Sequence, residues 1–157
     1  MSSPREVSSL SLAQHAVRLQ TLLERHITEV LRKHGLSRSE LDVLGALVSC
    51  GDAGARPQEL SSQLLLTTGG ISNILRRLQN DGHITREANR TDARSNIVRL
   101  TARGLDAARE AGTDVTEVIS RVLGPVDRSV IDTAAGVLHQ VLVALDEDSP
   151  VHRDLTR

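Results

Sequence analysis

The stretch PQELSSQLLLTTGGISNILRRLQNDG, residues 57–82, decides the fold. Pro57 suits the first turn of a short helix, where its missing N–H costs nothing. Thr67 is placed to cap a second helix over about residues 68–81, and Gly82 ends that helix. Two helices joined by so short a turn are typical of the helix-turn-helix that enters the major groove of DNA.

The second helix has two unlike faces when it is projected at about 100° per residue. Its apolar residues share one arc. The opposite arc carries Ser72, Asn73, Arg76, Arg77, Gln79 and Asn80. Arginine and asparagine form paired hydrogen bonds with guanine and adenine edges, and Gly69 lets the backbone approach a phosphate. An ordinary surface helix shows the same division, so the neighbouring elements decide between the two interpretations.

A basic hairpin follows this helix. Residues 83–87 and 96–100 resemble two short strands, and the tip between them reads Asn89-Arg90-Thr91-Asp92-Ala93-Arg94. Arginine at such a tip is drawn to the negative potential of a narrow minor groove. Residues 56–103 carry eight basic and four acidic side chains, whereas residues 104–157 carry five and ten. The middle of the chain therefore suits a polyanion better than its flanks do.

Ser37 and Glu40 form a Ser-x-x-Glu capping box, which predicts a helix start between the first flank and the helix-turn-helix.

The flanks predict long helices. Apolar residues recur at three- and four-residue steps over residues 10–35 and 105–146, and they have no partner in so small a winged domain. We therefore expect these helices to form a homodimer, with a flexible tail at residues 1–9 and a polar tail at residues 147–157. The chain has no Phe, Tyr or Trp, so its core must be aliphatic, and a protein that stacks single-stranded bases is disfavoured.

The order of these motifs resembles the MarR family of winged helix-turn-helix regulators. The resemblance rests on residues 57–60 and 64–73, on Asp92-Ala93-Arg94, which looks like the family's Asp-x-Arg wing signature, and on residues 100–104, a Leu-Thr-x-x-Gly helix start. It implies a mainly α fold with a small β-hairpin. In that fold, a winged helix-turn-helix domain over residues 36–104 is flanked by dimerisation helices.

The resemblance also implies a function. The protein is expected to bind a pseudo-palindromic double-stranded DNA operator as a homodimer, and to be a repressor released by a small-molecule effector. The recognition helix would enter the major groove, and Asp92 would hold Arg94 for the minor groove. The full predicted DNA-binding set is Thr67, Thr68, Gly69, Ser72, Asn73, Arg76, Arg77, Arg90, Asp92 and Arg94. Candidate polar handles for the effector, in a cleft between the dimer helices and the winged domain, are His15, Arg18 and His26.

Two residues depart from the family pattern. Arg56 stands where a Ser or Thr cap is common, so we expect that helix start to be less well capped. His83 replaces a residue that is usually apolar or aromatic, and we expect it to be a half-exposed packing residue.

Other functions compete with this one. Cys50 is the candidate for a redox sensor, but an inert, packed thiol is favoured there. The six histidines show no metal-ligand spacing, so we expect no metal and no cofactor. No Gly-x-Ser-x-Gly, Walker or Gly-x-Gly-x-x-Gly motif indicates catalytic residues of an enzyme. A helical adaptor that has lost DNA binding is disfavoured by Arg76, Arg77 and Arg94. The sequence shows no apolar signal core and no membrane-spanning run, which predicts a cytoplasmic protein without a membrane partner.

Overall fold

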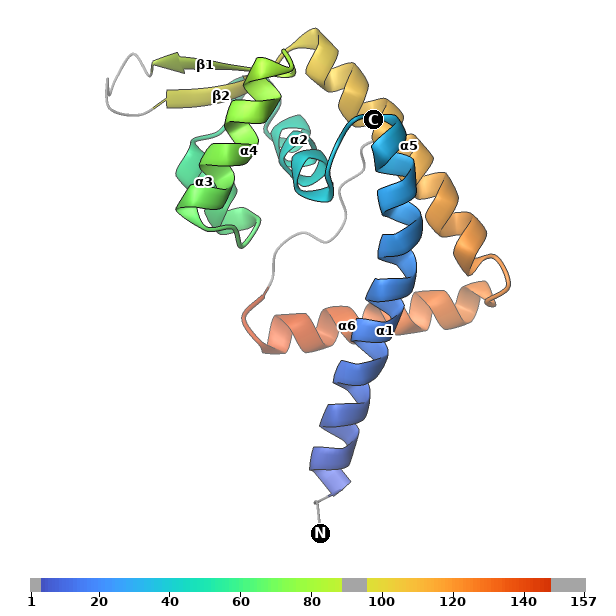
Figure 1. Cartoon of the computed structure of the whole chain (residues 1–157). Helices are drawn as coiled ribbons and strands as arrows, with labels where there is room; N and C mark the ends of the chain where they lie inside the picture. Colours follow the sequence, from blue (N-terminus) through green and yellow to red (C-terminus); the bar gives the residue numbers. More distant parts are fainter. Residues whose placement is uncertain (1–3, 89–95, 148–157) are drawn as a thin grey trace.

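The computed structural model describes residues 4–88 and 96–147, and it places a two-stranded wing beside a cluster of helices (Figure 1). In chain order the elements are α1 (Pro4–Lys33), α2 (Arg38–Cys50), the 3-10 turn η1 (Gly51–Ala53), α3 (Pro57–Gln63), α4 (Thr68–Asn80), β1 (Ile84–Ala88), β2 (Asn96–Leu100), α5 (Ala102–Leu123) and α6 (Arg128–Ala144). The predicted fold class, mainly α with a small β-hairpin, is confirmed.

Side-chain caps start three of the helices at the predicted residues. Ser37 Oγ accepts the N–H of Glu40 at 3.3 Å, and the Glu40 carboxylate accepts the N–H of Ser37 at 2.7 Å, which closes the capping box of α2. Thr67 Oγ1 accepts the N–H of Gly70 at 3.1 Å at the start of α4, and Thr101 caps α5 in the same way. Each cap satisfies N–H groups that the first turn of a helix leaves unpaired.

Helix α3 begins with only one of the two hydrogen bonds of a capping box. The N–H of Arg56 donates to the Glu59 carboxylate at 2.8 Å. The arginine side chain has no acceptor to offer in return. The start of α3 is therefore capped from one side only, through its third residue.

The core consists of leucine, isoleucine, valine and alanine, since the chain has no aromatic residue. Its most enclosed side chains include Leu31, Leu44, Leu47, Leu60, Ile71, Leu75, Leu78 and Val98. Three of these come from α4, whose apolar arc therefore lies in the core, as the periodicity predicted. This packing fixes the rotation of α4 about its own axis and so decides which side chains the helix presents outward.

Helix α5 is locked to the start of the wing. The N–H of Thr101 donates to the carbonyl of His83 at 3.0 Å, and the Thr101 hydroxyl donates to the carbonyl of Gly82 at 2.7 Å. A side-chain carbon at Gly104 would collide with the His83 carbonyl, so glycine is required there. This close approach buries His83 to 9 % exposure, and the expectation of a half-exposed histidine is wrong.

The outer helices depart most from expectation. We expected a flexible tail over residues 1–9, but α1 begins at Pro4, a residue type that suits the first helical turn. Ile27 and Leu31 are buried near the end of α1, whereas its N-terminal half extends away from the winged part (Figure 1). Helix α6 contributes no buried residue. None of the helices in residues 4–88 and 96–147 is long and apolar enough to cross a membrane.

Candidate nucleic-acid interface

The outward face of α4 is made of hydrogen-bonding side chains. Ile71, Leu75 and Leu78 are buried on the inner side of the helix. The exposed side chains are Ser72, Asn73, Arg76, Arg77, Gln79 and Asn80. The predicted division into an inner apolar arc and an outer polar arc is therefore confirmed as geometry. The outer arc combines donors and acceptors that match base edges with cations that match phosphates.

The predicted DNA-binding residues at the start of α4 differ in position: one caps the helix, and the others are exposed beside it. Thr67 Oγ1 is engaged as the helix cap, so its hydroxyl stabilises α4 rather than facing outward freely. Thr68 and Gly69 are exposed beside it, and a side-chain carbon built on Gly69 would meet no atom within 4 Å. The N–H groups of this first turn carry the positive end of the helix dipole, which favours an anion.

Arg76 is ordered by its own helix. Its Nη2 donates to Asn73 Oδ1 at 2.8 Å, across one turn of the exposed face. The hydrogen bond holds two side chains of the predicted set in one arrangement. Because a guanidinium carries five donors, Arg76 keeps further N–H groups for another partner.

Arg77 is held from outside its helix. Its Nε lies 3.2 Å from Oε1 of Glu40, the capping-box residue of α2. Glu40 is 2 % exposed, whereas the Arg77 side chain is 65 % exposed. The buried Glu40 carboxylate thus holds the exposed Arg77 side chain at its Nε. Sequence reasoning identified Glu40 only as a cap, because its contact with Arg77 joins positions far apart in the chain.

Arg86 is a further cation, on strand β1 of the wing. In the antiparallel pair of β1 and β2, Ile84 is opposite Leu100 and Arg86 is opposite Val98. Strand alternation places Arg86 on the same face as buried Ile84, and its Nε and Nη2 are buried without a hydrogen-bond partner among the described residues. The charge count included Arg86, but no motif distinguished it. The predicted tip residues Arg90, Asp92 and Arg94 lie outside the described residues.

Residues 34–95 match the sequence model of the MarR family. The match covers α2, α3, α4 and β1, and it ends before β2. Over these residues the chain is therefore similar to the MarR family. The HTH-type transcriptional regulator MhqR of Bacillus subtilis is similar to the chain, with 24 % identity over 116 residues, which are 74 % of this chain and 79 % of MhqR.

Solved structures share the fold of this chain. The Staphylococcus aureus MepR–DNA complex superposes with a TM-score of 0.75 at 17 % identity and covers 84 % of this chain and 96 % of MepR. CouR from Rhodococcus jostii RHA1, bound to p-coumaroyl-CoA, superposes with a TM-score of 0.72 at 15 % identity and covers 90 % of this chain and 94 % of CouR. At such identities the likeness establishes the winged helix architecture with its outer helices.

The turn between α3 and α4 holds a strained residue. Leu65 has a φ of 53°, in the left-handed region that favours glycine, and its side chain is 76 % exposed. It lies two residues before the cap of α4. Local strain of this kind persists when the surrounding packing fixes the backbone. Three consecutive leucines in the sequence gave no sign of which one would leave the core.

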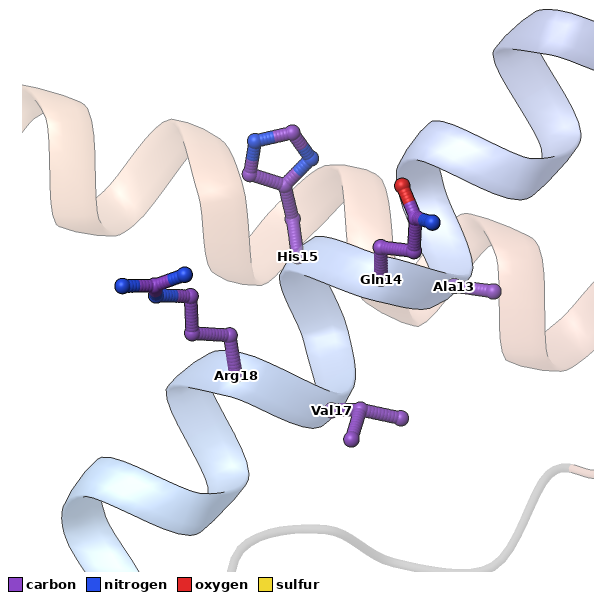
Figure 2. A pocket seen from close by; sticks show the side chains of 5 residues that line it. All are labelled: Ala13, Gln14, His15, Val17 and Arg18. Atoms are coloured by element: carbon purple, nitrogen blue, oxygen red, sulfur yellow. The ribbon is translucent and has the colours of Figure 1, made fainter.

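Two of the three predicted effector handles lie together. His15 and Arg18 line an open hollow of about 680 Å³ on α1, with Ala13, Gln14 and Val17 (Figure 2). His15 Nδ1 also lies 2.7 Å from the Ser11 carbonyl oxygen. His26 is half-buried and does not line this hollow. All five lining residues come from one helix, so this chain by itself supplies only one wall.

The candidate redox residue, Cys50, packs against the core. Cys50 is half-buried at the end of α2 and contacts the hydrophobic cluster. Among the described residues, no group of three His, Cys, Asp or Glu side chains is close enough to hold a metal ion.

Proposed function

We propose that this protein is a homodimeric transcriptional regulator that binds a pseudo-palindromic site in double-stranded DNA and acts as a repressor. The observation that carries the proposal is α4. Its apolar arc is buried in the core, and its outer arc presents Asn73, Arg76 and Arg77, all three already ordered by a hydrogen bond or an ion pair. Ordered side chains lose less conformational entropy when they bind.

The uncovered outer helices support a dimer. Large apolar side chains are exposed on α1 and on α6 with its C-cap residue, namely Val7, Leu10, Leu12, Val17, Leu19, Leu22, Val130, Val137, Leu138, Leu142, Val143 and Leu145. Contiguous exposed apolar surface marks an interaction site. A second copy of the chain, related by two-fold symmetry, covers the same surface on both protomers. It also places two α4 helices in successive major grooves, about 34–36 Å apart.

Release by a small molecule is part of the proposal. In the dimer, helices of the second copy supply the missing walls of the hollow beside His15 and Arg18. An anionic ligand with an apolar body suits a wall of this composition, since such sites are mostly apolar with a few polar groups. CouR, which shares the fold, is bound to p-coumaroyl-CoA. A ligand acts here only through its differential affinity for the DNA-binding and non-binding dimers. Binding to chromosomal DNA places this action in the cytoplasm.

The test is selection of bound fragments from genomic DNA, followed by gel shifts at several salt concentrations and light scattering of the free protein. We expect a dimer at micromolar concentration, two half-sites one helical turn apart, and binding that weakens steeply with salt because several phosphates are neutralised. A monomer, or binding indifferent to sequence and salt, contradicts the proposal. Peroxide release that disappears in Cys50→Ser would instead favour the redox sensor, and failure to select any fragment would favour the helical adaptor.

A further inference from the structure

Glu40 carries a negative charge in a place where capping alone does not require one. Its Oε2 accepts the N–H of Ser37 at 2.7 Å. A glutamine in its place would accept the same hydrogen bond through its amide oxygen, and capping boxes use either residue. The charge is 2 % exposed, and burying a carboxylate is costly unless a cation accompanies it. The capping role therefore explains the side chain's position but not its charge.

Arg77 accounts for the charge. Its Nε lies 3.2 Å from Oε1 of Glu40, so the two carboxylate oxygens have separate tasks, one within α2 and one toward α4. The contact uses the nitrogen nearest the arginine stem. The terminal nitrogens belong to a side chain that is 65 % exposed on the outer arc of α4. Glu40, the buried partner, lies in the core, and Arg77, the exposed partner, lies on the surface proposed to contact DNA.

We propose that Glu40 is a positioning residue for DNA recognition, which holds the Arg77 guanidinium in its binding geometry and fixes the register of α4 against α2. This inference rests on the proposed function. Glu40 itself touches no DNA. It acts through Arg77, because a planar guanidinium anchored at Nε has few orientations left for its outer edge.

The sign of the effect separates this role from simple electrostatics. A carboxylate close to a DNA-binding helix repels phosphates, so removing its charge should tighten binding to every duplex alike. Loss of positioning instead weakens binding to the specific site, while binding to an unrelated duplex tightens or stays the same. The ratio of the two affinities therefore measures the positioning role.

The decisive variant is Glu40→Gln, which keeps the capping oxygen and removes the charge. We expect the ratio of specific to non-specific affinity, measured by fluorescence anisotropy on the selected operator and on a scrambled duplex, to fall about tenfold. The matched control is Glu59→Gln. Glu59 also accepts an N–H at the start of a helix, at 2.8 Å from Arg56 N, but no ion pair with α4 is recorded for it among the described residues. Its ratio should stay at the wild-type value.

A double-mutant cycle completes the test. In an Arg77→Lys background, Glu40→Gln should change the ratio no further, because the guanidinium that it positions is gone. An unchanged ratio in Glu40→Gln, or equal effects with and without Arg77, overturns the inference while wild-type binding upholds the proposed function. If Glu40→Gln does not fold, Arg77→Lys alone decides: a wild-type ratio in that variant also overturns the inference. Absence of sequence-specific binding by the wild type refutes the proposed function itself.

Discussion

Helices α4 and α6 lead to opposite conclusions about what covers an apolar face. In α6, ten of 17 residues are Ala, Val, Leu or Ile, yet none is buried. In α4, four of 13 residues are Leu or Ile, and three of those four are buried. The less apolar helix is therefore the one that this chain covers by itself. Apolar composition shows that a helix needs a partner surface, but not whether the surface belongs to the same chain.

The two regions therefore have different tasks. The winged helix-turn-helix part forms its own core, and this core holds the outer arc of α4 in a fixed position. The outer helices leave apolar residues exposed, and in the proposed dimer a second copy covers them and sets the distance between two such arcs. In that arrangement, one chain is enough to recognise the bases of one half-site, whereas the distance between two half-sites is set by both chains of the dimer.

The largest effect is expected from disrupting the proposed dimer contact of α6. Leu138→Glu places a charge on the exposed apolar side of α6, where Leu138 is 36 % exposed. We expect the dimer to dissociate and operator affinity to fall a hundredfold or more, because linked half-sites lose their mutual avidity. Light scattering and gel shifts measure the two effects.

Gln140→Glu adds the same charge to α6 at a position turned away from Leu138, and it should leave both dimer and affinity intact. The cooperative thermal transition of the winged part should survive in Leu138→Glu, since α6 contributes nothing buried to it. A dimeric Leu138→Glu protein would show that α6 is not the interface.

The next effect tests the outer arc of α4. Arg76→Ala should cost about 1–3 kcal/mol of operator binding and relax the preference at particular base pairs. Asn73→Ala should reproduce part of this loss, because Asn73 Oδ1 no longer orders the guanidinium. Binding to a set of operators, each with one base pair changed, measures the preference. Equal weakening on all operators would assign Arg76 to phosphate rather than to bases.

The parts predicted from sequence are those encoded within a few residues. The outer arc of α4 follows from a 3.6-residue period, and the caps at Ser37, Thr67 and Thr101 follow from residue type and the residues just after them. The start of α1 at Pro4 was missed because serine-rich composition outweighed the proline, although both signals are local.

The parts that escaped prediction depend on contacts between distant segments. The pairing of Glu40 with Arg77 requires knowing that the first turn of α2 lies beside Arg77 of α4. The burial of His83 depends on how closely α5 approaches through Gly104. Periodicity describes the faces of an element, and it cannot tell which faces meet. The roles of the predicted DNA-binding residues therefore stay predictions, while the outward polar face of α4 is established.

A smaller effect is expected in the turn before α4. Leu65→Gly should raise the free energy of unfolding by about 0.5 kcal/mol, because relief of the left-handed backbone slightly exceeds the greater unfolded freedom of glycine. Chemical denaturation measures this difference. Leu65→Ala keeps the side-chain carbon that causes the strain and should give no such gain. A destabilised Leu65→Gly protein would show that the exposed leucine contributes packing after all.

The smallest effect concerns Asp127, the cap that starts α6. The Ser129 hydroxyl and N–H donate to Asp127 Oδ1 at 2.6 and 2.8 Å, and these hydrogen bonds hold the pKa of Asp127 below its ordinary value. A lowered pKa means that the charged form stabilises the folded state, so its contribution is present at neutral pH and is lost as pH falls below about 4. Asp127→Asn keeps an acceptor for the cap and removes the titration. We expect the variant's helix content, followed by circular dichroism, to lose less between pH 5 and pH 3 than that of the wild type. Asp106→Asn makes the same charge change outside any cap and should retain the wild-type acid response. If Asp106→Asn and Asp127→Asn behave alike, general charge rather than the cap governs α6, and the covering second copy becomes the main source of its stability.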